Sequence, residues 1–185
     1  MPSSSIACLR RSSPGQFDQI SRHSLLQLAA STVQKSQTNG WLISDQNDQW
    51  QTLLLAVAGL ELNQSVFFAG NIFSREEVKQ AVAGLAADDT PSFAFLTSGS
   101  TGTPKVVRHS VESLRQASIE LSSVIDVGGQ RMHHLFRPNY MAGVLNCVVL
   151  PWITGGSIVI SKPFSFSTAL ELPRELDTSQ SEVAW

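Results

Sequence analysis

The distribution of apolar residues along the chain predicts alternating helices and strands. Helical spacing of apolar positions, or a long apolar run rich in helix-forming residues, predicts helices at residues 24–33, 50–62, 75–86 and 111–125. Short runs of β-branched and aromatic residues predict strands at residues 41–44, 65–70, 92–97 and 132–136. Helices and strands that alternate in this way are typical of an α/β domain with a largely parallel sheet.

An uncharged segment, residues 138–161, is long enough to be a candidate membrane span. Pro151 and the pair Gly155-Gly156 interrupt it, and a membrane span seldom contains a proline followed by two glycines. We therefore predict a buried helix, a turn and a buried strand at residues 157–160. A membrane-associated protein anchored by this segment stays an alternative, and complete recovery of the protein without detergent would exclude it.

Composition indicates a folded protein of low charge. Apolar residues make up 42% of the chain and charged residues 15%, with a formal net charge of −2. A wholly disordered chain is thereby excluded, and the charge gives no support to a basic-patch nucleic-acid binder. Cys8 and Cys147 lie far apart and have no metal-ligand spacing around them, so we expect neither a disulfide framework nor a zinc cluster, but a reduced, cytoplasmic protein.

The first 20 residues are expected to form a flexible leader. They are rich in serine, and their apolar patch at residues 6–9 is too short for a secretory signal. Residues 21–185 then correspond to one domain. Because a β-favouring segment begins at the final residues SEVAW, we expect this domain to be incomplete.

Residues 97–105 form the part of the chain richest in candidate chemistry. After a predicted strand come two glycines, five hydroxyl side chains and a lysine: Thr97, Ser98, Gly99, Ser100, Thr101, Gly102, Thr103, Pro104 and Lys105. Glycine lets backbone N–H groups approach an anion, hydroxyls donate further hydrogen bonds, and lysine adds a positive charge. The carboxyl end of a strand is also where open α/β sheets bind ligands. This loop is therefore a candidate polyphosphate site, with a plain Ser/Gly-rich surface turn as the alternative.

Two common nucleotide-binding patterns do not fit this loop. In G-x-x-x-x-G-K-[ST], counted from Gly99, the second glycine falls on Pro104, and Lys105 is followed by Val106. The dinucleotide pattern G-x-G-x-x-G fails as well.

The stretch FLTSGSTGTPKVVRHS instead resembles the phosphate-loop signature of the AMP-forming acyl-adenylate synthetases. This family includes acyl-CoA synthetases, aryl-acid ligases, luciferases and peptide-synthetase adenylation domains. Nine consecutive positions, 97–105, fit the family pattern, and His109 and the following helix occupy the expected places. Further on, PNYMAG at residues 138–143, followed by an apolar helix, Gly155-Gly156 and a strand, resembles the acyl-pocket segment. The resemblance covers about residues 40–185 and implies part of the large N-terminal domain of such an enzyme, with an o-succinylbenzoate–CoA ligase-like or other acyl- or aryl-CoA ligase as the preferred whole enzyme.

The resemblance implies a two-step ligation. A carboxylate attacks the α-phosphate of ATP, which is accompanied by Mg²⁺, and gives an acyl-AMP and pyrophosphate; coenzyme A or a carrier-protein thiol then takes the acyl group. The implied catalytic residues are Thr101 and Lys105, and Lys105 neutralises charge as pyrophosphate leaves. The implied nucleotide-binding residues are Thr97, Ser98, Gly99, Ser100, Thr101, Gly102, Thr103 and Lys105. Tyr140 and Gly143 are the implied substrate residues, and no metal ligand is assigned within this chain.

Two residues depart from the family pattern. Val106 stands where many members have glycine, and Tyr140 stands where many have histidine. Tyrosine keeps an aromatic body and a polar tip, but the contact of that histidine with the acyl group does not carry over. The uncharged run at residues 141–153 either backs an apolar acyl pocket, which favours an aryl or fatty acid, or forms plain core, and both alternatives stay open.

Motifs that the family carries for adenine, ribose and the C-terminal catalytic lysine are absent from the sequence up to Trp185. We therefore expect an N-terminal piece of an acyl-adenylate synthetase that is inactive alone. The substrate of the whole enzyme is expected to be a small-molecule carboxylic acid, and a partner chain is one source of the missing parts. The alternative is a non-catalytic relative of reduced length that binds nucleotide or phosphate. The coding sequence after Trp185 would discriminate between the two, whereas the acid, the thiol acceptor and the oligomeric state are not determined by the sequence.

Other candidate residues have weaker support. Alternation along a strand puts His133 and His134 on opposite faces, so we do not expect them to share a metal. Arg108 is expected to be a solvated surface arginine rather than a phosphate ligand. The tryptophans are expected to be structural: Trp41, Trp50, Trp152 and Trp185.

Overall fold

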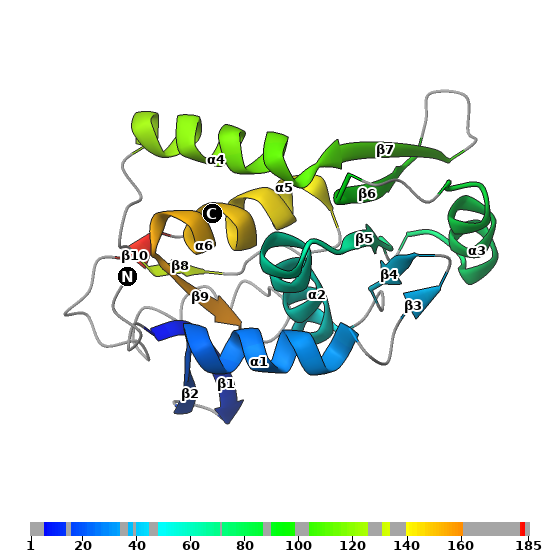
Figure 1. The fold of residues 1–185 in the computed structure, drawn as a ribbon. Coiled ribbons are helices and arrows are strands. Elements are labelled where there is room, and N and C mark those ends of the chain that lie inside the picture. The colour runs from blue at the N-terminus through cyan, green and yellow to red at the C-terminus, as the bar shows by residue number, and fades with distance from the viewer. Residues whose placement is uncertain are drawn as a thin grey trace.

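A computed structural model of the 185-residue chain shows a mixed α/β fold built on two sheets (Figure 1). The residues that the structure describes are 6–13, 16–33, 37–38, 40–44, 48–70, 72–86, 90–98, 104–125, 131–133, 140–160 and 182–183. The predicted α/β class is confirmed, but the described strands form two sheets in place of one, and each sheet mixes parallel and antiparallel pairs.

One sheet, which carries the predicted phosphate loop, has the strand order β3-β4-β5-β6-β7. Its strands are β3 (Gln37–Thr38), β4 (Trp41–Ile43), β5 (Ser65–Phe68), β6 (Ser92–Thr97) and β7 (Lys105–Ser110). The inner strands β4, β5 and β6 are parallel to one another, whereas β3 and β7 pair antiparallel at the two edges. The carboxyl ends of three parallel strands therefore meet at one edge of this sheet.

The other sheet has the strand order β10-β8-β9-β1-β2. Its strands are β1 (Ile6–Ser13), β2 (Gln16–Ser21), β8 (Arg131–His133), β9 (Ser157–Ile160) and β10 (Glu182–Val183). Here the structure differs from the expected flexible leader, because residues 6–13 and 16–21 form a hairpin whose strand β1 pairs in parallel with β9. The short apolar patch is too small for a signal peptide but large enough for a strand, and Cys8 and Leu9 are buried.

Seven helical segments lie around the sheets in the described parts of the chain. They are α1 (Arg22–Val33), α2 (Gln49–Leu62), α3 (Arg75–Ala83), α4 (Val111–Ile125), α5 (Met141–Val144), the π-helical segment η1 (Leu145–Val149) and α6 (Leu150–Thr154). Local chemistry sets several of their ends. Asp48 caps α2 by accepting a hydrogen bond from the Gln51 N–H, and Asn63 ends that helix in the left-handed conformation, with φ of 54°. At the start of α3, Ser74 and Glu77 form a reciprocal capping box.

The core follows from the alternation of side chains along β5 and β6. On one face of the sheet, Val66, Phe68, Phe93 and Phe95 pack with residues of α1, α2, α4 and the α5–η1–α6 segment. On the opposite face, Phe67 and Ala94 pack with Val78 and Val82 of α3. We call these the α2/α4 face and the α3 face. Both faces of the inner strands are therefore covered, which explains why those strands are apolar throughout.

The uncharged segment is a buried helical unit followed by a strand, as predicted. The segment η1 packs against α2 and α4, and α6 packs against α4. Gly155 then turns the chain with φ of 82°, and β9 follows. No helix in the described residues is both long enough and apolar enough to cross a membrane. Among these residues, therefore, no spanning helix supports the membrane-anchor alternative.

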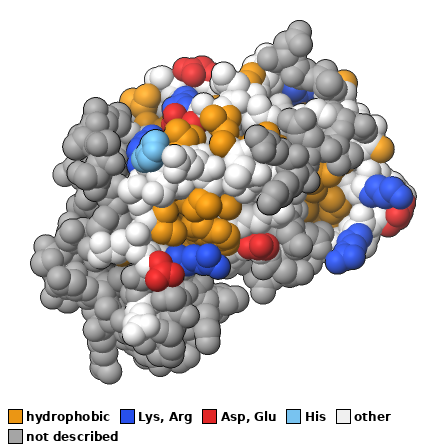
Figure 2. Space-filling model, turned by 60° about the horizontal axis from the view of Figure 1, so that its bottom comes forward, with side chains coloured by type: hydrophobic (Ala, Val, Ile, Leu, Met, Phe, Trp, Pro, Cys, Tyr) orange, Lys and Arg blue, Asp and Glu red, His pale blue; other side chains and the backbone are white. Residues whose placement is uncertain are grey.

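Exposed large hydrophobic side chains are spread over several elements: Leu28 on α1, Ile72 before α3, Ile119 and Val124 on α4, and Met141 on α5. Figure 2 shows one face of the molecule, on which hydrophobic side chains gather in separate patches bordered by polar and charged ones. Isolated exposed apolar residues of this kind are normal for a folded domain.

Candidate functional site

The predicted phosphate loop connects the two strands of a β-hairpin. Strands β6 and β7 pair antiparallel, and their register sets Thr97 opposite Lys105 at the end of the ladder. The Thr97 hydroxyl donates a hydrogen bond to the backbone oxygen of Lys105, with Oγ1 and O 3.3 Å apart. The two residues that begin and end the loop are thus held side by side at the carboxyl end of β6.

Three of the predicted nucleotide-binding residues are described, and all three are exposed: Thr97, Ser98 and Lys105. Their polar groups are therefore accessible to a ligand in solution. The remaining predicted nucleotide-binding residues lie outside the described residues: Gly99, Ser100, Thr101, Gly102 and Thr103. Their implied roles, including the catalytic role of Thr101, stay predictions.

The strand register also determines on which face of the sheet the loop lysine lies. Side chains alternate along a strand, so Thr97 projects to the same face as Phe95, which packs on the α2/α4 face. Lys105 pairs with Thr97 and shares that face. The cationic side chain therefore lies on the side of the sheet covered by α2, α4 and α5.

Tyr140 lies at the same edge of the sheet as the ends of the loop. Its ring approaches Gly70, which follows the carboxyl end of β5, close to Phe73 of the α3 face. The backbone oxygen of Tyr140 accepts the Val144 N–H at 2.9 Å at the start of α5, where Gly143 is buried. The structure thus brings the two segments that the sequence singled out, around residues 97–105 and 140–143, to one edge of the sheet.

Ser44, which the sequence interpretation missed, fixes the backbone at this edge. The residue follows β4 and is 3% exposed; its N–H donates to the Phe67 oxygen, and its hydroxyl accepts the Ala69 N–H, both at 3.0 Å. A serine directly after a short apolar strand was the available signal. Its effect is to hold the end of β5, and hence Gly70, in place.

Strand β7 was also missed, because its residues KVVRHS do not alternate between apolar and polar and only the pair Val106-Val107 favours a strand. His109 on β7 faces Phe95, with ring centroids 6.5 Å apart, and its buried Nε2 atom has no hydrogen-bond partner in the described structure. The Arg108 guanidinium lies over the ring of Trp41, 5.1 Å from its centroid, on the α3 face. Arg108 therefore lies on the opposite face from Lys105. It packs on an aromatic ring and is half-buried, whereas we expected a solvated surface arginine.

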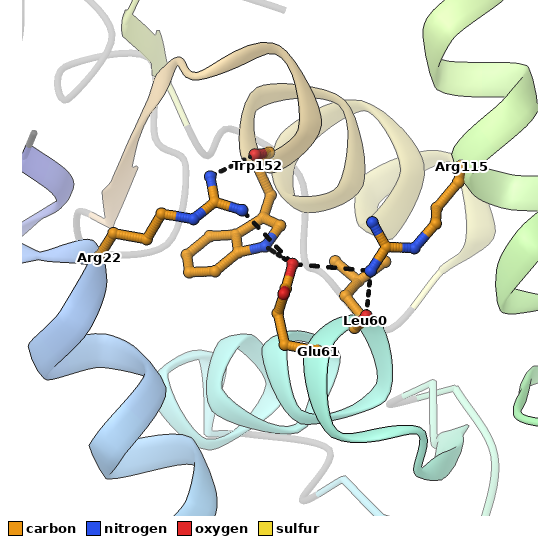
Figure 3. Close-up of polar contacts among 5 residues, drawn as sticks. All are labelled: Arg22, Leu60, Glu61, Arg115 and Trp152. Carbon is orange, nitrogen blue, oxygen red and sulfur yellow. Dashed lines mark hydrogen bonds and ion pairs between the residues drawn. The ribbon is translucent and has the colours of Figure 1, made fainter. Parts of the chain in front are cut away.

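Away from the loop, one carboxylate joins four helices (Figure 3). Glu61 at the end of α2 accepts the indole N–H of Trp152 at 2.7 Å and pairs with Arg22 at 3.4 Å and Arg115 at 3.6 Å. Arg22 also donates to the Trp152 backbone oxygen at 2.7 Å, and Arg115 donates to that of Leu60. No pattern in the sequence indicated this Glu61 cluster. It connects α1, α2, α4 and α6.

Metal-binding residues do not gather in the parts of the chain that the structure describes: no group of three or more His, Cys, Asp or Glu side chains is close enough to share an ion. The predicted site consists there of hydroxyl, lysine and tyrosine side chains. This donor set suits an anion.

The sequence profile of the family described as AMP-binding enzyme matches residues 12–181. Among solved structures, ATP-bound MatB from Rhodopseudomonas palustris superposes with a TM-score of 0.75 at 15% identity, covering 94% of this chain and 45% of that chain. O-succinylbenzoate coenzyme A synthetase (MenE) from Bacillus subtilis, in complex with ATP and magnesium ion, gives 0.71 at 13% identity, with 92% and 57% covered. The inhibitor-bound N-terminal domain of FACL13 from Mycobacterium tuberculosis gives 0.68 at 16% identity, with 91% and 56% covered.

These structural matches share the fold of the chain, which spans 45% to 57% of their length. No curated protein sequence matches the chain significantly.

Proposed function

Because the chain belongs to the family of AMP-binding enzymes, we propose that it forms part of an AMP-forming ligase that binds the phosphates of ATP at the β6–β7 loop. The observation that carries this proposal is the register that sets Thr97 opposite Lys105 at the same edge of the sheet as Tyr140. An exposed lysine beside a hydroxyl- and glycine-rich loop suits a polyphosphate, and an aromatic residue close by suits the organic acid that reacts with it.

The proposed chemistry is the formation of an acyl-adenylate. A carboxylate oxygen attacks the α-phosphorus of ATP, the bond from that phosphorus to the bridging oxygen breaks, and pyrophosphate leaves. Residues Ser98 to Gly102 would donate backbone and hydroxyl hydrogen bonds to the β- and γ-phosphates, with Thr101 among them, and Thr97 and Thr103 would flank them. Lys105 would stabilise the charge that builds up on the leaving pyrophosphate. Magnesium would arrive with the nucleotide and neutralise further phosphate charge.

The proposed substrate is a small aryl or fatty carboxylic acid, bound beside Tyr140 and Gly143, with coenzyme A or a carrier-protein thiol as the acyl acceptor. The apolar character of the α5–η1–α6 segment behind Tyr140 supports an apolar acid. The cytoplasm is the proposed location, supported by the two thiols, Cys8 and Cys147, which are both buried within the chain.

ATP binding by the purified chain tests the proposal directly. We expect Lys105→Ala to weaken ATP binding about tenfold, equivalent to about 1.4 kcal/mol, because one charge-assisted contact with phosphate is lost. Lys79→Ala is the matched control: it removes the same charge from an exposed position on α3, which covers the opposite face. Calorimetric titration with ATP and Mg²⁺ would measure both. Equal ATP affinities for the wild type and Lys105→Ala would contradict the proposed role of the loop.

ATP–pyrophosphate exchange with a panel of aryl and fatty acids tests the proposed formation of an acyl-adenylate. Because the chain spans about half the length of the solved structures that it matches, we expect no exchange from this polypeptide alone. Robust exchange would overturn the proposal that further parts are needed. ATP binding without exchange, followed by exchange once the downstream part is supplied, would distinguish a ligase portion from a non-catalytic phosphate-binding relative.

A further inference from the structure

Gly70 leaves the space into which the ring of Tyr140 packs. A Cβ atom added at Gly70 would lie 3.3 Å from Cε1 and 3.5 Å from Cζ of Tyr140, and 3.5 Å from Cδ2 of Phe73. The backbone does not need glycine there, since among the described glycines a positive φ occurs at Gly40 and Gly155. Gly70 therefore lacks a side chain at a position where one would crowd the ring of Tyr140, although alanine could adopt the backbone conformation found there.

The strand end around Gly70 has little freedom to move away from an added methyl group. The Ala69 N–H is held by the buried Ser44 hydroxyl at 3.0 Å, and the Gly70 oxygen accepts the Phe73 N–H at 3.2 Å. Phe68 is paired in register with Phe95 of β6. The ring of Tyr140 is half-buried and is attached where α5 begins. A methyl group at position 70 would consequently displace the ring by a few tenths of an ångström and leave the strand in place.

We propose that Gly70 is a positioning residue that sets where the Tyr140 ring lies and, through it, how large a carboxylic acid the site accepts. This inference rests on the proposed function, in which the acid binds beside Tyr140. A methyl group at Gly70 pushes the ring away from the end of β5 and so changes the space beside the ring in which the acid is proposed to bind. Larger acids would then lose more affinity than small ones, because a close-packed apolar site is sensitive to single methyl groups.

The sequence provides a specific probe, because Tyr140 is its single tyrosine. Labelling with 3-fluorotyrosine places fluorine on a Cε atom, the type of atom that faces Gly70. In ¹⁹F NMR spectra of the full chain we expect Gly70→Ala to shift the Tyr140 resonance. Gly84→Ala is the matched control, since its added Cβ would meet two backbone oxygens at an ordinary 3.7 Å, and it should leave the resonance unchanged.

The size role is tested by titrating the labelled proteins, with ATP and Mg²⁺ present, with propionate, hexanoate, benzoate and 4-phenylbutyrate. We expect carboxylates to move the wild-type resonance. In Gly70→Ala the ratio of the Kd for 4-phenylbutyrate to the Kd for propionate should rise about tenfold, the discrimination that one methyl group gives in an apolar site. The same ratio should be unchanged in Gly84→Ala.

Each contrary result overturns a defined part of the proposal about Gly70. An unshifted resonance in folded Gly70→Ala overturns the positioning role. A shifted resonance with an unchanged Kd ratio overturns the size role and leaves the proposed function intact. If no carboxylate moves the wild-type resonance, the acid does not bind at Tyr140 and the size role fails, whereas the Lys105→Ala titration separately decides phosphate binding. Should Gly70→Ala not fold, the double variant Gly70→Ala/Tyr140→Ala removes the crowded ring and must recover folding; failure to recover overturns the proposal.

Discussion

Gly59 shows how one missing side chain fixes the position of a helix. A Cβ added at this residue of α2 would lie 2.1 Å from Cε1 of Phe93, a fully buried ring on β6. The backbone of the helix and the ring therefore touch directly. The close approach places α2 against the strand whose end begins the loop.

We predict that Gly59→Ala destabilises the fold by about 1 to 2 kcal/mol. Alanine gains about 1 kcal/mol in helix propensity, but overpacking a core costs about 1 to 3 kcal/mol, and a contact this short lies at the upper end. Urea unfolding would measure the difference. Gly84→Ala, where an added Cβ would make only ordinary contacts at 3.7 Å, should change the unfolding free energy by less than about 0.5 kcal/mol. A stabilised Gly59→Ala variant would contradict the observed contact.

The thiol of Cys8 is a second residue whose chemistry is set by burial. Desolvation raises its pKa from 9.0 to about 12, although the nearby Arg10 charge acts in the opposite direction. Because the thiolate is the reactive form, we predict that Cys8 resists iodoacetamide at mildly alkaline pH in the folded protein and reacts readily after unfolding in urea. Mass spectrometry of the Cys8 peptide would measure both, and rapid labelling of the native chain would contradict the prediction.

The same shift has a defined effect on stability. The folded state favours the protonated thiol of Cys8. The contribution of this thiol to the unfolding free energy is therefore fully present below the ordinary pKa of 9.0 and is lost as the pH rises toward about 12. Cys8→Ser should make the unfolding free energy less dependent on pH across that window. An unchanged dependence would show that other groups control alkaline unfolding.

Residue chemistry that is local in sequence could be predicted, and chemistry that spans the fold could not. The loop residues 97–105 are contiguous, so their composition was visible at once. Glu61, by contrast, meets partners 39 and 91 positions away, Arg22 and Trp152. Nothing in the sequence around Glu61 distinguishes it from any other surface carboxylate.

At the scale of elements, the capping box of α3 gives a direct test of why that helix starts at Arg75. The Ser74 hydroxyl accepts the Glu77 N–H at 3.2 Å, and Glu77 accepts the Ser74 N–H at 2.7 Å. We predict that Ser74→Ala costs about 1 kcal/mol of unfolding free energy. Ser123→Ala, an exposed serine inside α4, should be neutral or slightly stabilising. Equal effects of the two serine changes, measured by urea unfolding, would contradict a role for the cap.

The cap also gives a pH dependence with a known sign. Hydrogen bonds from the backbone and hydroxyl of Ser74 lower the pKa of Glu77 below its ordinary 4.5. The stabilisation that the ionised Glu77 gives to the folded state is therefore present above pH 4.5 and is lost as the pH falls through the lowered pKa. The difference between the wild type and Ser74→Ala should therefore shrink in acid.

The Glu61 cluster predicts an order of effects between two substitutions. Glu61→Gln retains an acceptor for the Trp152 indole and loses two ion pairs whose partners are about 30% exposed, so it should cost less than about 1 kcal/mol. Glu61→Ala leaves the indole N–H without its acceptor and should cost about 1 to 2 kcal/mol. Urea unfolding followed by tryptophan fluorescence would measure both, with Glu112→Ala on α4 as the exposed control. Equal costs of the two substitutions would show that charge pairing, which both remove, and not the indole bond holds the four helices.

Elements with a strong period were predictable, and elements defined by their partners were not. The helices α2 and α4 and the strands β5 and β6 each carry enough apolar or β-favouring residues to be recognised alone. Strand β7 follows the loop directly and is an edge strand of half-buried residues, so its pattern was weak. Its pairing with β6 is what turns a loop after a strand into a hairpin.

At the scale of the whole molecule, the α/β class and membership of the family of AMP-binding enzymes were predicted correctly from one motif and the alternation of elements. The division into two sheets was not predictable. It depends on β1 pairing with β9, which joins Cys8 to Ile158 across most of the chain. Local periodicity holds no information on pairs so far apart.

That pairing leads to a prediction about the first residues. Strand β1 covers the edge of β9, Cys8 is part of the main core, and the Arg10 guanidinium lies 4.8 Å from the ring centroid of Trp50 on α2. Removing residues 1–21 should therefore lower the melting temperature by several degrees and expose the edge of β9 to aggregation. Removing residues 1–5, which precede β1, is the control and should leave the melting temperature unchanged. Differential scanning calorimetry and light scattering would measure both, and identical melting of the two truncated chains would favour a flexible leader over the strand β1.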